Sequence, residues 1–183
     1  MDRRGFIIAG AASVAGLSGC VSEPVSNASD LRSFNVVNMR VEADRAVAQA
    51  EKPITLTPVQ VEEIIRQNAL GTVQAARAGG DRDVIIDVLV GRIFVPTVAS
   101  AGLTARGAAA IDATIQVRDA RTGQAIGAPR GLRAHADQRF GGLLGAALTA
   151  EALQRNGQAG EIGLAGQALG KRIAGIVYGI RPA

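Results

Sequence analysis

Cysteine, histidine and the aromatic residues are nearly absent from this chain of 183 residues, which holds one Cys, one His, one Tyr, four Phe and no Trp. A single cysteine excludes an intrachain disulfide, so the packing of the core alone must stabilise the fold. One histidine argues against zinc clusters and histidine-based catalytic triads. The shortage of aromatic side chains disfavours sites that bind sugars or flat ligands by stacking.

A long apolar run is also missing near the start of the chain. The apolar stretch at residues 6–17 is rich in glycine and is far shorter than the ~20 residues that a bilayer-spanning helix needs. Arg3 and Arg4 precede this stretch, and small residues follow it. A charged start, a short apolar run and small residues before a break are typical of a secretory signal peptide.

The composition predicts three parts in the chain. Residues 1–19 are expected to be the signal peptide, and residues 20–33 a polar tether with a proline and several serines. Removal of residues 1–19 from the 183 leaves 164, a suitable length for one domain, which we place at residues 34–183.

The end of the signal peptide resembles the lipobox of bacterial lipoproteins, because it reads Leu17-Ser18-Gly19-Cys20. The resemblance implies that a signal peptidase recognises Leu17, Ser18 and Gly19 and cuts before Cys20. It also implies that the Cys20 thiol carries a diacylglycerol and that its amino group carries an acyl chain such as palmitate; no other cofactor is expected. The alternative is an ordinary signal peptide in which the cysteine occurs by chance.

The same resemblance carries an expectation for the membrane. Lipoproteins of this kind hold two or three acyl chains, and each buried CH₂ contributes ~0.8 kcal/mol to membrane binding. Their sorting depends on the residue after the cysteine, where Asp favours the inner membrane. Val21 stands there instead, which favours the periplasmic face of the outer membrane. The expected contacts are this membrane and an unidentified protein of the envelope.

The first residues also resemble the twin-arginine export signal, through Arg3-Arg4-x-Phe6-Ile7. The sequence departs from that pattern at two positions, since Asp2 precedes the arginines and Ile8 follows the apolar pair. Paired arginines occur in ordinary Sec signals too, so both export routes stay open.

Alternation and helical spacing predict the elements of the domain. A helix is expected after Thr57, Pro58 and Gln60, which suit its N-cap, N1 and N3 positions, and it should end at Gly79-Gly80. Two more helices are expected near the C-terminus. One runs from Gly141 to about Gly157, and the other carries apolar residues from Ile162 to Ile180.

Four strands are expected. The segment 34–43 is apolar on both parities, which indicates two covered faces or a bulge, and the apolar, β-branched segment 83–95 is typical of a central strand. Residues 110–118 alternate cleanly, which indicates an antiparallel strand with one solvated face. A turn at 119–123 leads into a partner strand at 124–136 that Pro129 interrupts.

These elements predict an α+β fold of order β-α-β-β-β-α-α, with a small, mostly antiparallel sheet and helices packed on one face. This order is similar to that of the small α+β domains of several uncharacterised outer-membrane lipoproteins, and the likeness covers most of the mature chain. The resemblance rests on element order and implies no active residue.

The candidate reactive residues are more simply explained by structural roles. His135 has no cysteine partner, and we interpret it as a surface or structural residue. Asp83 and Asp87 lie ~13 Å apart along a strand, too far to share a metal ion, and with Asp81 they suit turns and solvated edges. The segment from Gly166 to Lys171 lacks the Ser or Thr of a phosphate-binding loop and has a helical pattern.

Small residues at Gly141-x₃-Gly145 and Gly166-x₃-Gly170 permit close helix packing, for which contact within the domain is the simplest explanation. Leu143, Leu144 and Leu148 belong to the first of the two C-terminal helices, and two arrangements are open for them. They pack on the sheet, or they form an exposed surface that contacts another protein.

The sequence therefore predicts a protein without catalytic or metal-binding residues that acts as an accessory or scaffold. The alternative is a module that binds a lipid or other apolar ligand during envelope transport. The 20 Lys and Arg residues are dispersed against 16 Asp and Glu residues. Dispersed basic residues without interleaved aromatics, at a periplasmic address, predict no nucleic-acid binding.

Overall fold

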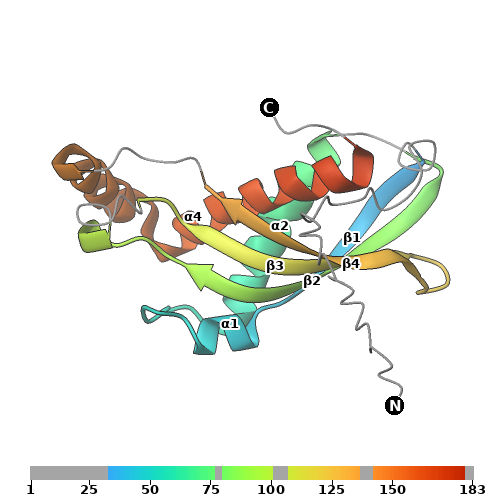
Figure 1. Ribbon diagram of the computed structural model, residues 1–183, viewed down its shortest axis with the longest axis horizontal. Coiled ribbons are helices and arrows are strands. Elements are labelled where there is room, and N and C mark those ends of the chain that lie inside the picture. Colours follow the sequence, from blue (N-terminus) through green and yellow to red (C-terminus); the bar gives the residue numbers. More distant parts are fainter. Residues whose placement is uncertain (1–32, 77–79, 101–106, 137–141, 180–183) are drawn as a thin grey trace, which may run out of the picture.

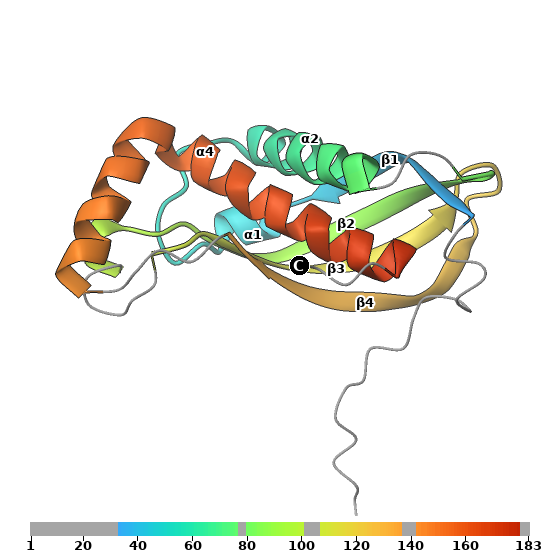
Figure 2. The same cartoon turned by 90° about the horizontal axis from the view of Figure 1, so that it is seen from above.

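A four-stranded sheet with helices on one face forms the framework of the protein (Figures 1 and 2). The computed structural model describes residues 33–76, 80–100, 107–136 and 142–179. The strands are β1 (Phe34–Glu42), β2 (Arg82–Phe94), β3 (Ala110–Asp119) and β4 (Ala125–His135), and they lie side by side in this order. The helices are α1 (Asp44–Ala48), α2 (Pro58–Ala76) and α4 (Gly142–Tyr178).

The predicted α+β class, the predicted element order and the mostly antiparallel sheet are confirmed. β1 and β2 run parallel because α2 connects them, whereas the pairs β2–β3 and β3–β4 are antiparallel. The short helix α1 is an addition to the predicted order. It has no side-chain cap, and its one buried residue is Ala46. Neither a capping signal nor an apolar period therefore predicted this helix from the sequence.

A bulge explains the apolar residues on both parities of β1. The pairing with β2 shifts register between Val36 and Asn38, so Val37 falls between two paired positions. Val36 and Met39, on opposite parities, are therefore both buried, while 42% of Val37 stays exposed. In β3 the predicted alternation is confirmed, with the apolar residues in the core and the polar ones on the open face of the sheet.

Helix α2 begins as its sequence predicts. The Gln60 backbone N–H donates to the Thr57 hydroxyl (3.3 Å), and the Thr57 N–H donates to the Gln60 side-chain oxygen (2.9 Å), which together form a capping box. The buried row of α2 consists of Val61, Ile65, Ala69 and Val73. Residues 77–79 lie outside the described part of the chain, so the predicted end at Gly79-Gly80 is not tested.

Helix α4 consists of two helical segments that meet at Gly157, close to the predicted boundary at Asn156-Gly157. Gly157 has φ 61° and ψ −172°, and this left-handed conformation favours glycine. Helical structure resumes directly after Gly157, four residues before the Ile162 at which the second apolar row was predicted to start. We call residues 142–156 the first half of α4 and residues 158–178 the second half.

The second half of α4 packs closely against α2 through three glycines. A Cβ atom on Gly163 or Gly166 would lie 3.2 Å from the Asn68 side chain, and one on Gly170 would lie 2.6 Å from the Ala69 carbonyl oxygen. The buried residues Ile162, Leu169 and Ile173 of the same half join the core under the sheet. The predicted use of Gly166-x₃-Gly170 for packing within the domain is thereby confirmed.

We predict that Gly170→Ala destabilises the fold by about 1–3 kcal/mol, because its methyl group would overlap the Ala69 carbonyl and Thr72 Cβ. Gly71→Ala, in the middle of α2, is the matched control. No atom lies within 4 Å of a Cβ at that position, so this substitution should stabilise the fold by about 0.5–1 kcal/mol through the helix preference of Ala. Urea unfolding measures both changes; equal stability of the two variants would contradict the close contact.

Candidate contact surface and polar sheet face

The residues of the predicted export signal and lipid anchor lie outside the described part of the chain. They are Arg3, Arg4, Phe6, Leu17, Ser18, Gly19 and Cys20. Gly141, which begins the first of the two predicted small-residue motifs, also lies outside it. Leu143, Leu144 and Leu148 are described, and the structure decides between the two arrangements that were open for them.

The three leucines are exposed on the first half of α4. The exposed fractions are 93% for Leu143, 68% for Leu144 and 40% for Leu148. Figure 2 shows this half of the helix beyond the end of the sheet, away from the face that α2 and the second half cover. The arrangement in which these leucines pack on the sheet is therefore not the one that the structure adopts.

A further exposed apolar side chain, that of Val98, lies at the same end of the molecule. The helical turn at residues 98–100 lies beside the first half of α4 in both views (Figures 1 and 2) and carries Val98, which is 47% exposed. Among the described residues, seven large hydrophobic side chains are exposed, and four of them belong to these two segments. Such clustering is typical of a contact surface, whereas scattered exposed apolar residues are ordinary.

Hydrogen bonds join the break at Gly157 to the loop that precedes α2. The Gln158 amide donates to the Pro53 carbonyl oxygen (3.0 Å), and its oxygen accepts hydrogen bonds from the Thr55 N–H (2.8 Å) and hydroxyl (2.9 Å). On the other side of the break, the Asn156 amide donates to Glu161 (3.2 Å), whose side chain is fully buried. These bonds fix the point from which the first half of α4 projects.

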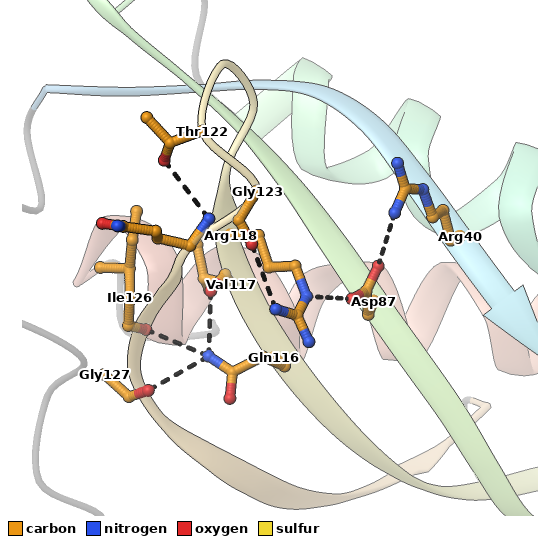
Figure 3. A network of polar contacts seen from close by, with 10 residues as sticks. Arg40, Asp87, Gln116, Val117, Arg118, Thr122, Gly123, Ile126 and Gly127 are labelled. Atoms are coloured by element: carbon orange, nitrogen blue, oxygen red, sulfur yellow. Dashed lines mark hydrogen bonds and ion pairs between the residues drawn. The ribbon is translucent and has the colours of Figure 1, made fainter.

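The open face of the sheet carries a network of ion pairs (Figure 3). Arg118 on β3 donates to Asp87 on β2 over 2.5 Å, and Arg40 on β1 lies 3.9 Å from the other oxygen of the same carboxylate. Arg118 also donates to the Gly123 carbonyl oxygen at the β3–β4 turn (3.2 Å). The network joins three strands across the solvated face.

The Gln116 side-chain amide donates hydrogen bonds where the pairing of β3 with β4 is irregular, near Pro129. The pairing of β3 with β4 shifts register between Ile115 and Val117, where Gly127 has φ 71°. The Gln116 amide donates there to the carbonyl oxygens of Val117 (2.9 Å) and Gly127 (3.1 Å), as Figure 3 shows. Proline is accommodated because β4 is an edge strand.

Further along the same face, Arg133 on β4 donates two hydrogen bonds to Asp112 on β3. Nε donates to Oδ1 over 2.6 Å, and a terminal nitrogen donates to Oδ2 over 2.8 Å. These bonds lower the pKa of Asp112 below its usual 3.8, with a smaller contribution from the charge of Arg133. The bidentate geometry fixes the two side chains more firmly than a single ion-pair contact would.

The other candidate residues have the structural roles that were predicted for them. Asp83 accepts a hydrogen bond from the Asn35 amide (2.7 Å), and His135 is exposed at the end of β4. The segment from Gly166 to Lys171 is part of α4 and packs on α2. Within the described ranges, no group of three or more His, Cys, Asp or Glu side chains is arranged to hold a metal ion. Among the described helices, none is both long enough and apolar enough to cross a bilayer.

The ion-pair partners and the hydrogen bonds at the helix break were not predictable from the sequence. The alternation of β3 predicted that Asp112, Gln116 and Arg118 face solvent, but their partners are set by strand register. Gln158 lies 103 residues from Thr55 along the chain. No local pattern signals such a contact.

The chain belongs to DUF6778, a family of unknown function whose pattern it matches over residues 49–163. A provisionally assigned lipoprotein from Caulobacter crescentus is 16% identical over 84% of this chain and 96% of its own, with a TM-score of 0.35. A PelC variant from Paraburkholderia phytofirmans, a dodecamer, is 14% identical over 75% of this chain and 86% of its own, with a TM-score of 0.34. Both scores are too low for functional inference. No functionally curated protein matches the chain.

We predict that Leu144→Asp leaves the fold nearly intact, because the new carboxylate replaces a side chain that is 68% exposed. Ile162→Asp is the matched control in the second half of the same helix. Ile162 is fully buried, and an unpaired charge there should destabilise the fold by several kcal/mol. Thermal unfolding followed by circular dichroism measures both variants. A Leu144→Asp protein that melts as early as Ile162→Asp would contradict the exposed position.

We predict that Asp112 contributes acid-sensitive stability. Its pKa is lower in the folded than in the unfolded protein, so this contribution is complete above the unfolded value of about 3.8 and is lost as the pH falls through the folded value. Asp112→Asn should therefore lose less stability than the unmodified protein between about pH 5 and about pH 2. Arg133→Gln should flatten the profile in the same way. Urea midpoints against pH measure this; parallel profiles for all three proteins would rule it out.

Proposed function

We propose that this chain is a lipid-anchored lipoprotein on the periplasmic face of the outer membrane, and that it acts as a non-enzymatic accessory or scaffold through protein contacts. The observation that carries the proposal is the exposed leucine surface of the first half of α4, formed by Leu143, Leu144 and Leu148. A role of this kind requires an anchor and a contact surface, and the chain offers a candidate for each.

The anchor is supported by the sequence Leu17-Ser18-Gly19-Cys20 after a short apolar run. Two or three acyl chains on Cys20 would hold the domain firmly, whereas a single myristoyl-length chain binds membranes only marginally. Residues 21–33 separate Cys20 from the first strand and include a proline and several polar residues. A segment of this composition suits a spacer between the bilayer and the domain.

The contact role is supported by energetics. Transfer of one leucine side chain from water to an apolar contact stabilises a complex by about 1.5–3 kcal/mol. Three leucines on one helix therefore provide at most about 4.5–9 kcal/mol, which is comparable with the cost of immobilising two proteins. In addition, the position of the helix is fixed by the bonds of Gln158, which lowers the ordering cost on binding.

The alternative function, binding of an apolar ligand, requires an enclosed apolar cavity. The leucine surface is instead an exposed helix face. Two hollows on the sheet, around Arg82 and Asp119 and around Thr114 and Arg133, are open and lined partly by charged residues. A third, between α2 and α4, has no charged side chain among the described residues that line it, which include Ile64, Asn68 and Leu164, but it is also open rather than enclosed. These features favour protein contact over a ligand-binding role.

Cys20→Ser tests the anchor. We expect the variant to lack the lipid and to remain unprocessed or to appear in the soluble periplasmic fraction, because only a thiol forms the thioether to diacylglycerol. Ser22→Ala, two residues away, should be lipidated and should fractionate with the outer membrane. Metabolic labelling with palmitate and membrane fractionation measure both. A Cys20→Ser protein that stays firmly in the outer membrane would refute the proposed anchor.

A further inference from the structure

The exposed backbone edges of the sheet are poorly suited to association. Among the described residues, β1 has no strand on its outer side. There the Val36 carbonyl oxygen accepts a hydrogen bond from Gln74 (3.1 Å), and the Met39 N–H donates to the Asn38 side chain (2.8 Å). On β4, the opposite edge, Pro129 lacks an N–H and lies within an irregular stretch. Because both edges are obstructed, strand addition is disfavoured, and the leucine surface is the stronger candidate for a contact.

The leucine surface carries almost no charge. Residues 142–156 include two charged side chains, Glu151 and Arg155, and these form an ion pair with each other. Helices that lie on membranes usually display several Lys or Arg residues that attract anionic lipids. A neutral surface attracts neither such lipids nor a strongly charged protein, and it repels no copy of itself.

The leucine surface also lies at the end of the sheet opposite to the tether. The tether joins β1 at Phe34, which pairs with Arg82 at one end of the sheet. The first half of α4 follows β4, whose last residue His135 pairs with Ala110, and Ala110 pairs with Phe94 at the other end. Figure 2 shows the two ends apart, and the 13 residues of β2 between them span ~40 Å. The leucines are therefore remote from the anchored end.

We propose that the leucine surface binds the same surface of a second copy of this chain, a partner that the proposed anchor makes available. Ala147, which is exposed, lies between Leu143 and Leu144 around the helix, so this small side chain of one copy can face a leucine of the other. A two-fold contact of this kind needs no second surface. The Glu151–Arg155 pairs of the two copies add no net charge.

The size of the surface predicts where the dimer forms. Three leucines and their neighbours are fewer residues than the roughly 20–30 per partner, about 800 Å², that a standard stable interface buries. In dilute solution the contact is therefore weak. Lipid anchors confine all copies to one membrane and raise their effective concentration, which favours weak contacts strongly. The dimer is thus expected on the membrane, and this step rests on the proposed function.

Disulfide trapping tests the dimer, since Cys20 is the one cysteine of the chain and its thiol is blocked by the proposed lipid. Leu144→Cys in the full chain then supplies the only free thiol. Oxidation of isolated membranes should yield a disulfide-linked species of twice the chain mass. Val59→Cys, at a position that is 71% exposed on α2, is the matched control and should yield at least about tenfold less. Adding Leu148→Asp to Leu144→Cys should reduce the yield of the disulfide-linked dimer by a similar factor.

Three results would overturn the dimer. They are equal yields from Leu144→Cys and Val59→Cys, no effect of Leu148→Asp, and trapping of Leu144→Cys to a species of another mass. Palmitate labelling of the same samples separates this failure from failure of the anchor. Labelled, membrane-bound protein without dimer refutes the dimer alone. Unlabelled protein refutes the anchor, and with it the confinement on which the dimer depends.

Discussion

The close contact between α2 and the second half of α4 holds both helices on the sheet. At Gly163, Gly166 and Gly170 the two helices approach so closely that a methyl group would meet side chains or backbone of α2. Asn68 of α2 lies at this contact, where its side-chain oxygen accepts a hydrogen bond from Gln167 (3.2 Å). Because the helices pack against each other at short range, the apolar rows of both can reach the same face of the sheet.

This contact also determines what the first half of α4 can do. With the second half fixed on α2 and Gln158 bonded to the preceding loop, the backbone at Gly157 turns the first half away from the sheet. Its leucines then have no core to enter. The exposed apolar end of the molecule therefore follows from the packing at its centre together with one residue of positive φ.

The elements that sequence could predict are those with local causes. The capping box of Thr57 and Gln60, the alternation of β3 and the glycine at the helix break are all encoded within a few residues. The ion pairs of Asp87 and Asp112 were not predictable, because they depend on which residues the register places opposite each other. The leucines show the same limit, since a helical period reveals an apolar face but not whether that face meets the core or solvent.

The break at Gly157 has an electrostatic consequence as well. It ends one helix and starts another inside the domain, so the buried Glu161 lies at the start of the second half of α4. The N-terminus of a helix carries a partial positive charge that stabilises a nearby anion. A continuous helix across residue 157 would have no such terminus there, and Glu161 would lie in the middle of a helix. The interrupted helix is therefore better matched to a buried acid than a straight one.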